Sequence, residues 1–133
     1  ARGWDWIGIN LADGSALMAF RLRGAADSAM WSAASLRQAV GSTRISPPAA
    51  VAFEPLRHWR SPRTGITYPV AWNVRIEQRV FRVEVLMDDQ ELDSRRSTGA
   101  IYWEGLSELR NGAGEAVGRG YLEMTGYKKP LRL

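Results

Sequence analysis

The chain has 133 residues, of which 45% are hydrophobic and 24% charged, with a formal net charge of +4. This size and composition predict one globular domain with its own core, and no apolar run reaches the roughly 20 residues of a membrane-spanning helix. The absence of cysteine excludes disulfides and thiol chemistry, and the single histidine, His58, argues against a histidine-built metal site.

Arginine supplies nearly all of the positive charge, and the arginines are scattered among Asp and Glu. That pattern is typical of a solvated basic surface rather than of a stripe that follows a phosphate backbone. We therefore expect no nucleic-acid partner. The weaker alternative, a basic nucleic-acid-binding barrel, would require the aromatic residues to lie on one open face.

The first alternating segment runs from Trp4 to Leu11 and is followed by Asp13-Gly14 and a second alternating segment, 16–23. Asp-Gly between two such segments predicts a β-hairpin with a two-residue loop. The resulting register places an apolar face on one side and stacks arginine on tryptophan on the other. The predicted cross-strand pairs are Leu11 with Ala16, Ile9 with Met18, Ile7 with Phe20, Trp4 with Arg23 and Trp6 with Arg21.

Further strands are predicted along the rest of the chain, with a helix as the alternative only over 28–39. The polar segment 88–97 has loop composition. About eight strands joined by short turns predict an all-β fold, an antiparallel up-and-down barrel that can hold one small ligand. The later predicted strands are 30–38, 51–59 with a bend at Pro55, 70–77, 80–87, 100–110 and 116–127.

The last two strands carry aromatic and acidic residues in alternation. If Arg110 faces Glu115, then Glu104 faces Tyr121 and Tyr102 faces Glu123, and Arg119 shares their face. Inside a barrel, two carboxylates beside two phenols would suit general acid–base catalysis. On an outward face, the same residues would stabilise the strand pair, with Arg119 balancing the glutamates. The sequence leaves both interpretations open.

Other site classes lack their motifs. The chain has no Gly-x-Ser-x-Gly, no GxGxxG and no Walker loop, which excludes the common nucleophile-elbow and phosphate-cradling sites. The acidic group Asp88, Asp89, Glu91 and Asp93 lacks the glycine-centred loop of an EF-hand, so no metal site is proposed there.

Several blocks of the sequence resemble the C-terminal lipocalin-like domain of the AttH and carotenoid 1,2-hydratase family. The final block is the most specific of them, and together the blocks span nearly the whole chain. The matching blocks are Trp4–Leu11 with Asp13-Gly14, Leu17–Arg23, Trp59–Gly65 with Tyr68–Trp72, Asp89–Leu92, Tyr102–Gly105 and Gly118–Tyr127.

This resemblance implies that residues 1–133 form one lipocalin-like β-barrel, the C-terminal half of a longer two-barrel protein that is exported to the periplasm or the exterior. Its partner would be the N-terminal barrel of the same protein. The family includes predicted secreted hydrolases, and its hydratase branch adds water to a carbon–carbon double bond of an isoprenoid without a metal or organic cofactor. Family members usually carry Tyr at the position of Phe20.

The resulting hypothesis is a barrel that binds a hydrophobic small molecule, lipid or isoprenoid-like, with hydrolysis or hydration requiring the N-terminal barrel. The alternative is a non-catalytic barrel, filled by its own side chains, that docks a partner domain. The expected acid–base residues are Asp5, Tyr102, Glu104 and Glu123, and the expected ligand-binding residues are Trp4, Trp6, Trp72, Trp103 and Tyr121.

Overall fold

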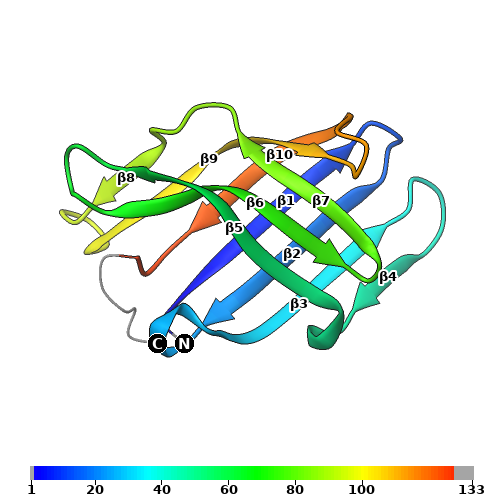
Figure 1. Ribbon diagram of the computed structural model, residues 1–133, viewed down its shortest axis with the longest axis horizontal. Helices are drawn as coiled ribbons and strands as arrows, with labels where there is room; N and C mark the ends of the chain where they lie inside the picture. The colour runs from blue at the N-terminus through cyan, green and yellow to red at the C-terminus, as the bar shows by residue number, and fades with distance from the viewer. Residues whose placement is uncertain (1, 128–133) are drawn as a thin grey trace.

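The computed structural model describes residues 2–127, which form ten strands and two short 3-10 turns (Figure 1). The turns are η1 (Ala25–Asp27) and η2 (Pro48–Ala50). The strands are β1 (Gly3–Leu11), β2 (Ala16–Arg23), β3 (Ala29–Arg37), β4 (Thr43–Ser46), β5 (Val51–Arg60), β6 (Thr67–Ile76), β7 (Arg79–Val85), β8 (Glu91–Ser94), β9 (Ala100–Arg110) and β10 (Ala116–Met124).

All strand pairs are antiparallel, and the described strands form one sheet in the order β4-β3-β2-β1-β10-β9-β7-β6-β5, with β8 paired to β9. The path ends at β4 and β5, so the sheet is curled rather than closed. Figure 1 shows β5, β6 and β7 crossing over β1, β2 and β3. The prediction of an all-β, antiparallel, lipocalin-like fold is confirmed. The short strands β4 and β8 were not predicted, because polar residues dominate both.

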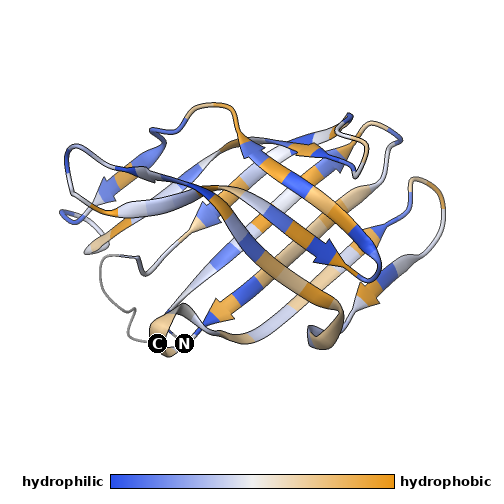
Figure 2. Ribbon diagram, viewed as in Figure 1, coloured by the Kyte–Doolittle hydropathy of each residue, from blue (hydrophilic) through white to orange (hydrophobic). Residues whose placement is uncertain are grey.

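The core lies between the two halves of the curled sheet and is supplied by alternate residues of its strands. Ile7, Val70, Val74, Val83 and Leu109 are completely buried there. Figure 2 shows the matching alternation of hydrophobic and hydrophilic residues along β6 and β7. The alternation identified in the sequence therefore separates an inner from an outer face. Within residues 2–127 no helix is long and apolar enough to cross a membrane.

The turn between β1 and β2 differs from the predicted two-residue loop. Gly14 has φ of +90°, and its N–H donates to the Leu11 carbonyl over 3.1 Å, which gives the three-residue loop common in hairpins. This loop moves the whole pairing by one residue, so the predicted cross-strand pairs are wrong. The observed pairs are Ile9 with Leu17, Ile7 with Ala19, Trp6 with Phe20, Asp5 with Arg21, Trp4 with Leu22 and Gly3 with Arg23.

Two other predictions about the chain are confirmed. Residues 29–37 form a strand and not a helix. The register of β5 against β6 shifts between Pro55 and Arg57, where proline removes a ladder hydrogen bond. The predicted loop 88–97 is partly wrong, because Glu91–Ser94 pair with the first residues of β9.

Candidate functional site

The inner face of β1 and β2 carries a buried charged cluster around Asp5, whose side chain has no exposure. Arg21 Nε lies 2.7 Å from Asp5 Oδ2, and Arg23 Nη1 lies 3.0 Å from Oδ1. The Tyr127 hydroxyl also donates to Asp5 Oδ1, over 2.7 Å. Arg23 Nη2 donates to the Thr125 carbonyl, which ties the cluster to the end of β10. A buried carboxylate is thus met by two guanidinium groups and a phenol, as a charge in the interior requires.

Aromatic rings enclose the two arginines. The Arg21 guanidinium carbon lies 5.0 Å from the centre of the Trp72 ring, and that of Arg23 lies 3.9 Å from the Tyr127 ring. Arginine therefore stacks on aromatic rings as expected, but on rings of the interior and not on Trp4 and Trp6. Burial, followed by the charge of Asp5, raises the pKa of the Tyr127 hydroxyl well above its usual value.

A second buried carboxylate, Glu91, holds the loop between β5 and β6 against β8. Its side chain is 1% exposed and accepts hydrogen bonds from Ser61 Oγ (2.7 Å), Thr64 Oγ1 (2.7 Å) and the Tyr68 hydroxyl (2.8 Å). Burial and the bond to Glu91 raise the pKa of Tyr68. The Tyr68 ring lies 5.8 Å from that of Tyr127, so the two clusters are neighbours. This cluster was not predicted, because the partners of Glu91 lie 23 to 30 residues away in the chain.

The outer face of the same sheet carries the acidic and aromatic residues of β9 and β10. The β9–β10 turn has three residues, which moves the pairing by one residue from the predicted register, and a register shift between Ala116 and Gly118 moves it by one more. A total shift of two residues keeps each side chain on its predicted face but changes its cross-strand partner. The prediction of a shared face is therefore confirmed, and the predicted partners are wrong. Glu104 lies opposite Glu123, and Tyr121 lies opposite Leu106. Trp103, Leu122 and Met124 point to the core instead.

A groove of about 550 Å³ crosses this outer face. Trp6 stands between Glu123 of β10 and Phe20 of β2 in the strand register, and the Trp4 indole Nε1 donates to Glu123 Oε1 over 2.6 Å. An adjoining hollow of about 260 Å³ shares Glu104 and Glu123 with the groove and includes Tyr102. The groove is lined by Trp4, Trp6, Met18, Phe20, Leu22, Glu104 and Glu123.

The shape of the groove depends on Gly8. A Cβ atom at Gly8 would lie 2.3 Å from the Trp6 ring, so the outer edge of the indole occupies the space above the glycine. The groove is therefore built from a large aromatic residue next to a position without a side chain.

The structure divides the candidate residues between the two faces. Trp4, Trp6, Tyr102, Glu104 and Glu123 meet at the outer groove, and Tyr121 lies on the same outer face. Asp5, Trp72 and Trp103 lie on the inner face with zero exposure. A side chain with no accessible surface adjoins neither solvent nor a water-sized void, so both inner tryptophans pack within the core. Among residues 2–127 no group of three or more His, Cys, Asp and Glu side chains is placed to hold a metal ion.

The AttH family model, described as AttH-like, matches residues 1–127. The chain belongs to the AttH-like family. No curated protein matches it.

Two solved structures share the fold of this AttH-like domain. A "putative AttH" from Nitrosomonas europaea is 54% identical, with a TM-score of 0.91 over 96% of this chain and 39% of that protein. The kievitone hydratase of Nectria haematococca is 21% identical, with a TM-score of 0.73 over 96% of this chain and 40% of that enzyme. The second likeness shows a shared fold alone. The chain thus spans well under half the length of both proteins.

Proposed function

We propose that this AttH-like domain binds a hydrophobic small molecule, lipid or isoprenoid-like, in the groove on its outer face. The observation that carries the proposal is the lining of the groove, in which Trp4, Trp6 and Phe20 stand beside two carboxylates. Ligand sites combine an apolar wall with a few polar groups that fix orientation. The inner face offers no comparable surface at Trp72 and Trp103, which are packed on all sides.

Glu104 and Glu123 are the proposed acid–base residues of this groove, with Tyr102 beside them. Like charges directly opposite each other on neighbouring strands destabilise a sheet, so this pair is a poor choice for stability alone. One carboxyl group to donate a proton and one to activate water would serve hydration or hydrolysis of a bound molecule. Asp5 is assigned the separate role of neutralising Arg21 and Arg23 in the interior.

The groove is open to solvent along one side, and we propose that the N-terminal barrel of a longer protein covers it. The chain accounts for only 39% of the 54%-identical relative, which leaves that protein ample further chain. In this arrangement the complete enzyme would need both parts, and the domain alone would bind without turnover.

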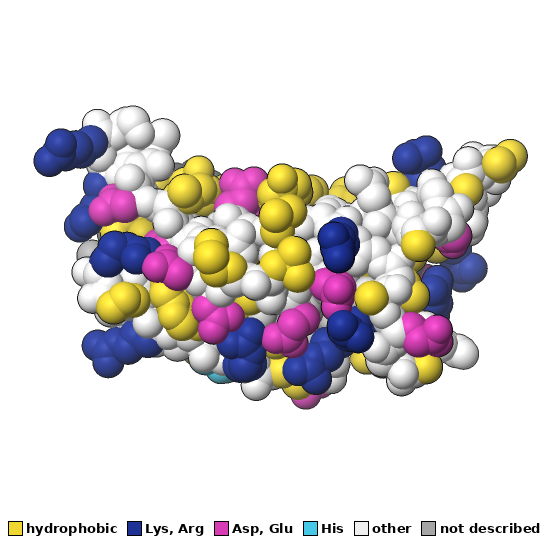
Figure 3. All heavy atoms as spheres, turned by 90° about the horizontal axis from the view of Figure 1, so that it is seen from above, with side chains coloured by type: hydrophobic (Ala, Val, Ile, Leu, Met, Phe, Trp, Pro, Cys, Tyr) yellow, Lys and Arg dark blue, Asp and Glu magenta, His cyan; other side chains and the backbone are white. Residues whose placement is uncertain are grey.

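A second function, docking without catalysis, is favoured by the exposed apolar residues around the groove. Met30, Trp31, Leu106 and Tyr121 are 46–60% exposed on strands of this sheet. Figure 3 shows further hydrophobic side chains interspersed with charged ones over the side seen from above, where β8 and β9 lie. Exposed apolar patches of this kind mark surfaces that bind other molecules.

The test is calorimetric titration of the protein with oleyl alcohol and with geranylgeraniol. Removal of the Trp6 indole by Trp6→Ala is expected to weaken binding at least about tenfold, since a buried aromatic group contributes about 1.5–3 kcal/mol. Trp59→Phe, which alters a ring stacked on Tyr68 away from the groove, serves as the control. No saturable binding of either compound, or equal affinities in both variants, would contradict the ligand site and favour docking.

A further inference from the structure

A second hollow of about 440 Å³ adjoins the groove along the strands. The two share Trp6 and Met18 and are named together here as the trough on the outer face of β1 and β2. The lining changes along it from aromatic to polar. The second hollow is lined by Asn10, Ser35, Arg37 and Thr43 around the small residues Gly8 and Ala16.

Strand register places these groups in one row across the sheet. Asn10 lies opposite Ala16, Ala16 opposite Arg37, and Arg37 opposite Thr43. No carboxylate lines this hollow. The row therefore offers a guanidinium, a hydroxyl and an amide group, all of which can donate hydrogen bonds to an anion.

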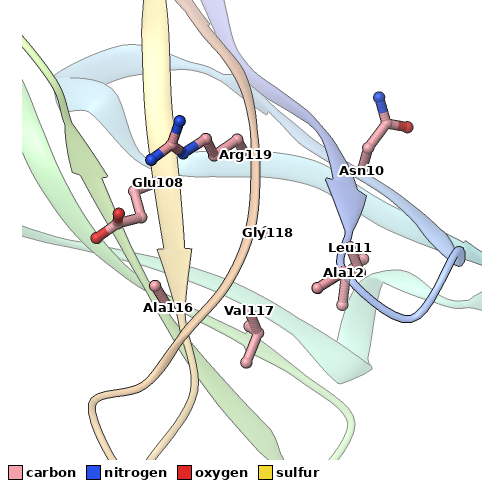
Figure 4. Close-up of a pocket in the computed structure, with 8 residues that line it drawn as sticks. All are labelled: Asn10, Leu11, Ala12, Glu108, Ala116, Val117, Gly118 and Arg119. Atoms are coloured by element: carbon pink, nitrogen blue, oxygen red, sulfur yellow. The ribbon is translucent and has the colours of Figure 1, made fainter.

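Arg37 is exposed and makes no ion pair with any carboxylate of residues 2–127, whereas seven of the fifteen arginines in this range do. The neighbouring cation of the same row, Arg119, is directed elsewhere: Figure 4 shows it extending from β10 across β9, while Asn10 extends away from it. Arg37 is thus the cation at this end of the trough. The arginines with carboxylate partners include Arg57, Arg63, Arg82, Arg95 and Arg110.

The two ends of the trough carry different groups, aromatic and acidic at one end and an arginine at the other, at a fixed distance along the strands. The row of Glu104, Glu123, Trp6 and Phe20 and the row of Asn10, Ala16 and Arg37 are four residues apart along the strands. Four residues of β-strand span roughly 14 Å. The stretch between them is formed by Gly8 and Met18, which are opposite each other and apolar.

We propose that the trough takes a single-chain amphiphile whose carboxylate head binds at Arg37 and whose apolar chain lies over Met18 and Trp6. This inference rests on the proposed ligand site and adds the class and direction of the ligand. The two glutamates then face the middle of the chain rather than the head group, because about 14 Å separates the two rows. An in-chain double bond is the group on which an acid–base pair at that position would act.

The test compares oleate, oleyl alcohol and oleylamine, each at a concentration at which it is monomeric, by calorimetric titration of the protein and two variants. Oleate is expected to bind the unmodified protein about tenfold more tightly than oleyl alcohol, the effect of one charge-assisted hydrogen-bond set, and oleylamine more weakly still. Arg37→Gln should remove this preference by weakening oleate binding about tenfold, with a much smaller change for oleyl alcohol. Arg44→Gln, which removes the same charge from the adjacent position of β4, should preserve it.

The possible outcomes distinguish the Arg37 head-group inference from the proposed ligand site on which it rests. Saturable binding of oleate and oleyl alcohol with equal affinity would overturn the Arg37 inference and leave the groove intact. An equal loss of preference in Arg44→Gln would overturn it too, because the effect would then be one of net charge. Failure of all three compounds to bind would overturn the ligand site together with this inference.

Discussion

The carboxylates on the two faces of the β1–β10 region have opposite kinds of neighbours. On the inner face, Asp5 is fully buried and is met by Arg21, Arg23 and Tyr127. On the outer face, Glu104 stands opposite another acid, Glu123. The first arrangement compensates a buried charge, whereas the second places like charges side by side. The comparison indicates that the inner cluster maintains the fold and that the outer pair is present at a cost to stability.

The largest expected effect comes from breaking the inner cluster. Asp5→Asn removes the charge that compensates two buried guanidinium groups, and we expect a loss of about 3–5 kcal/mol in the free energy of unfolding. Urea denaturation followed by tryptophan fluorescence measures it. The control Asp89→Asn breaks an exposed ion pair with Arg63 and should cost far less. Similar losses in both variants would refute the distinction between the two environments.

The pairing of β1 with β10 can be disturbed at Gly120. A Cβ atom there would lie 1.9 Å from the Gly8 carbonyl oxygen, which is backbone and cannot rotate away. Gly120→Ala is therefore expected to force β1 and β10 apart at a cost of about 2–3 kcal/mol. Gly112, at the tip of the β9–β10 turn, has open space around it, and Gly112→Ala should be close to neutral. Thermal melts of both variants make the comparison, and equal melting temperatures would contradict it.

The inner face should also make the protein sensitive to alkali. The raised pKa values of Tyr68 and Tyr127 mean that both hydroxyls keep their protons in the folded state at a pH where the unfolded chain has lost them. Below about pH 10 both hydroxyls are protonated in the folded and in the unfolded state, so they do not make the free energy of unfolding depend on pH. Above it, stability should fall by up to about 1.4 kcal/mol per pH unit for each tyrosine.

Denaturation midpoints between pH 9 and pH 11 would measure this slope. Tyr127→Phe should be less stable at neutral pH, because its hydrogen bond to Asp5 is lost, yet should show a shallower decline in alkali. An unchanged slope in Tyr127→Phe would show that the tyrosine does not titrate with unfolding.

The smallest expected effect has the opposite sign. Glu104→Gln removes one of two like charges on neighbouring strands and should raise the free energy of unfolding by about 0.2–1 kcal/mol. Glu54→Gln, at an exposed position of β5, is the control and should change little. In the full-length protein Glu104→Gln should abolish turnover. A destabilised Glu104→Gln variant would argue that the glutamate supports the sheet.

Alternation along the strands is a local property, and it was sufficient to predict much of this protein. It predicted the eight longer β segments, the bend of β5 at Pro55, and the shared face of Tyr102, Glu104 and Glu123. It also separated Trp103 from these residues. These features depend on the two-residue repeat of a strand and on the missing N–H of proline, both of which act within a few residues.

The tertiary structure decided which face became interior and which side chains met across it. One additional loop residue between β1 and β2 moved Arg21 and Arg23 from the neighbourhood of Trp4 and Trp6 to Asp5. The curl of the sheet placed Glu104 and Glu123 outside and brought Tyr127 onto a residue 122 positions earlier. Turn length and sheet curvature are set by the packing of the whole sheet, so alternation alone could not determine them.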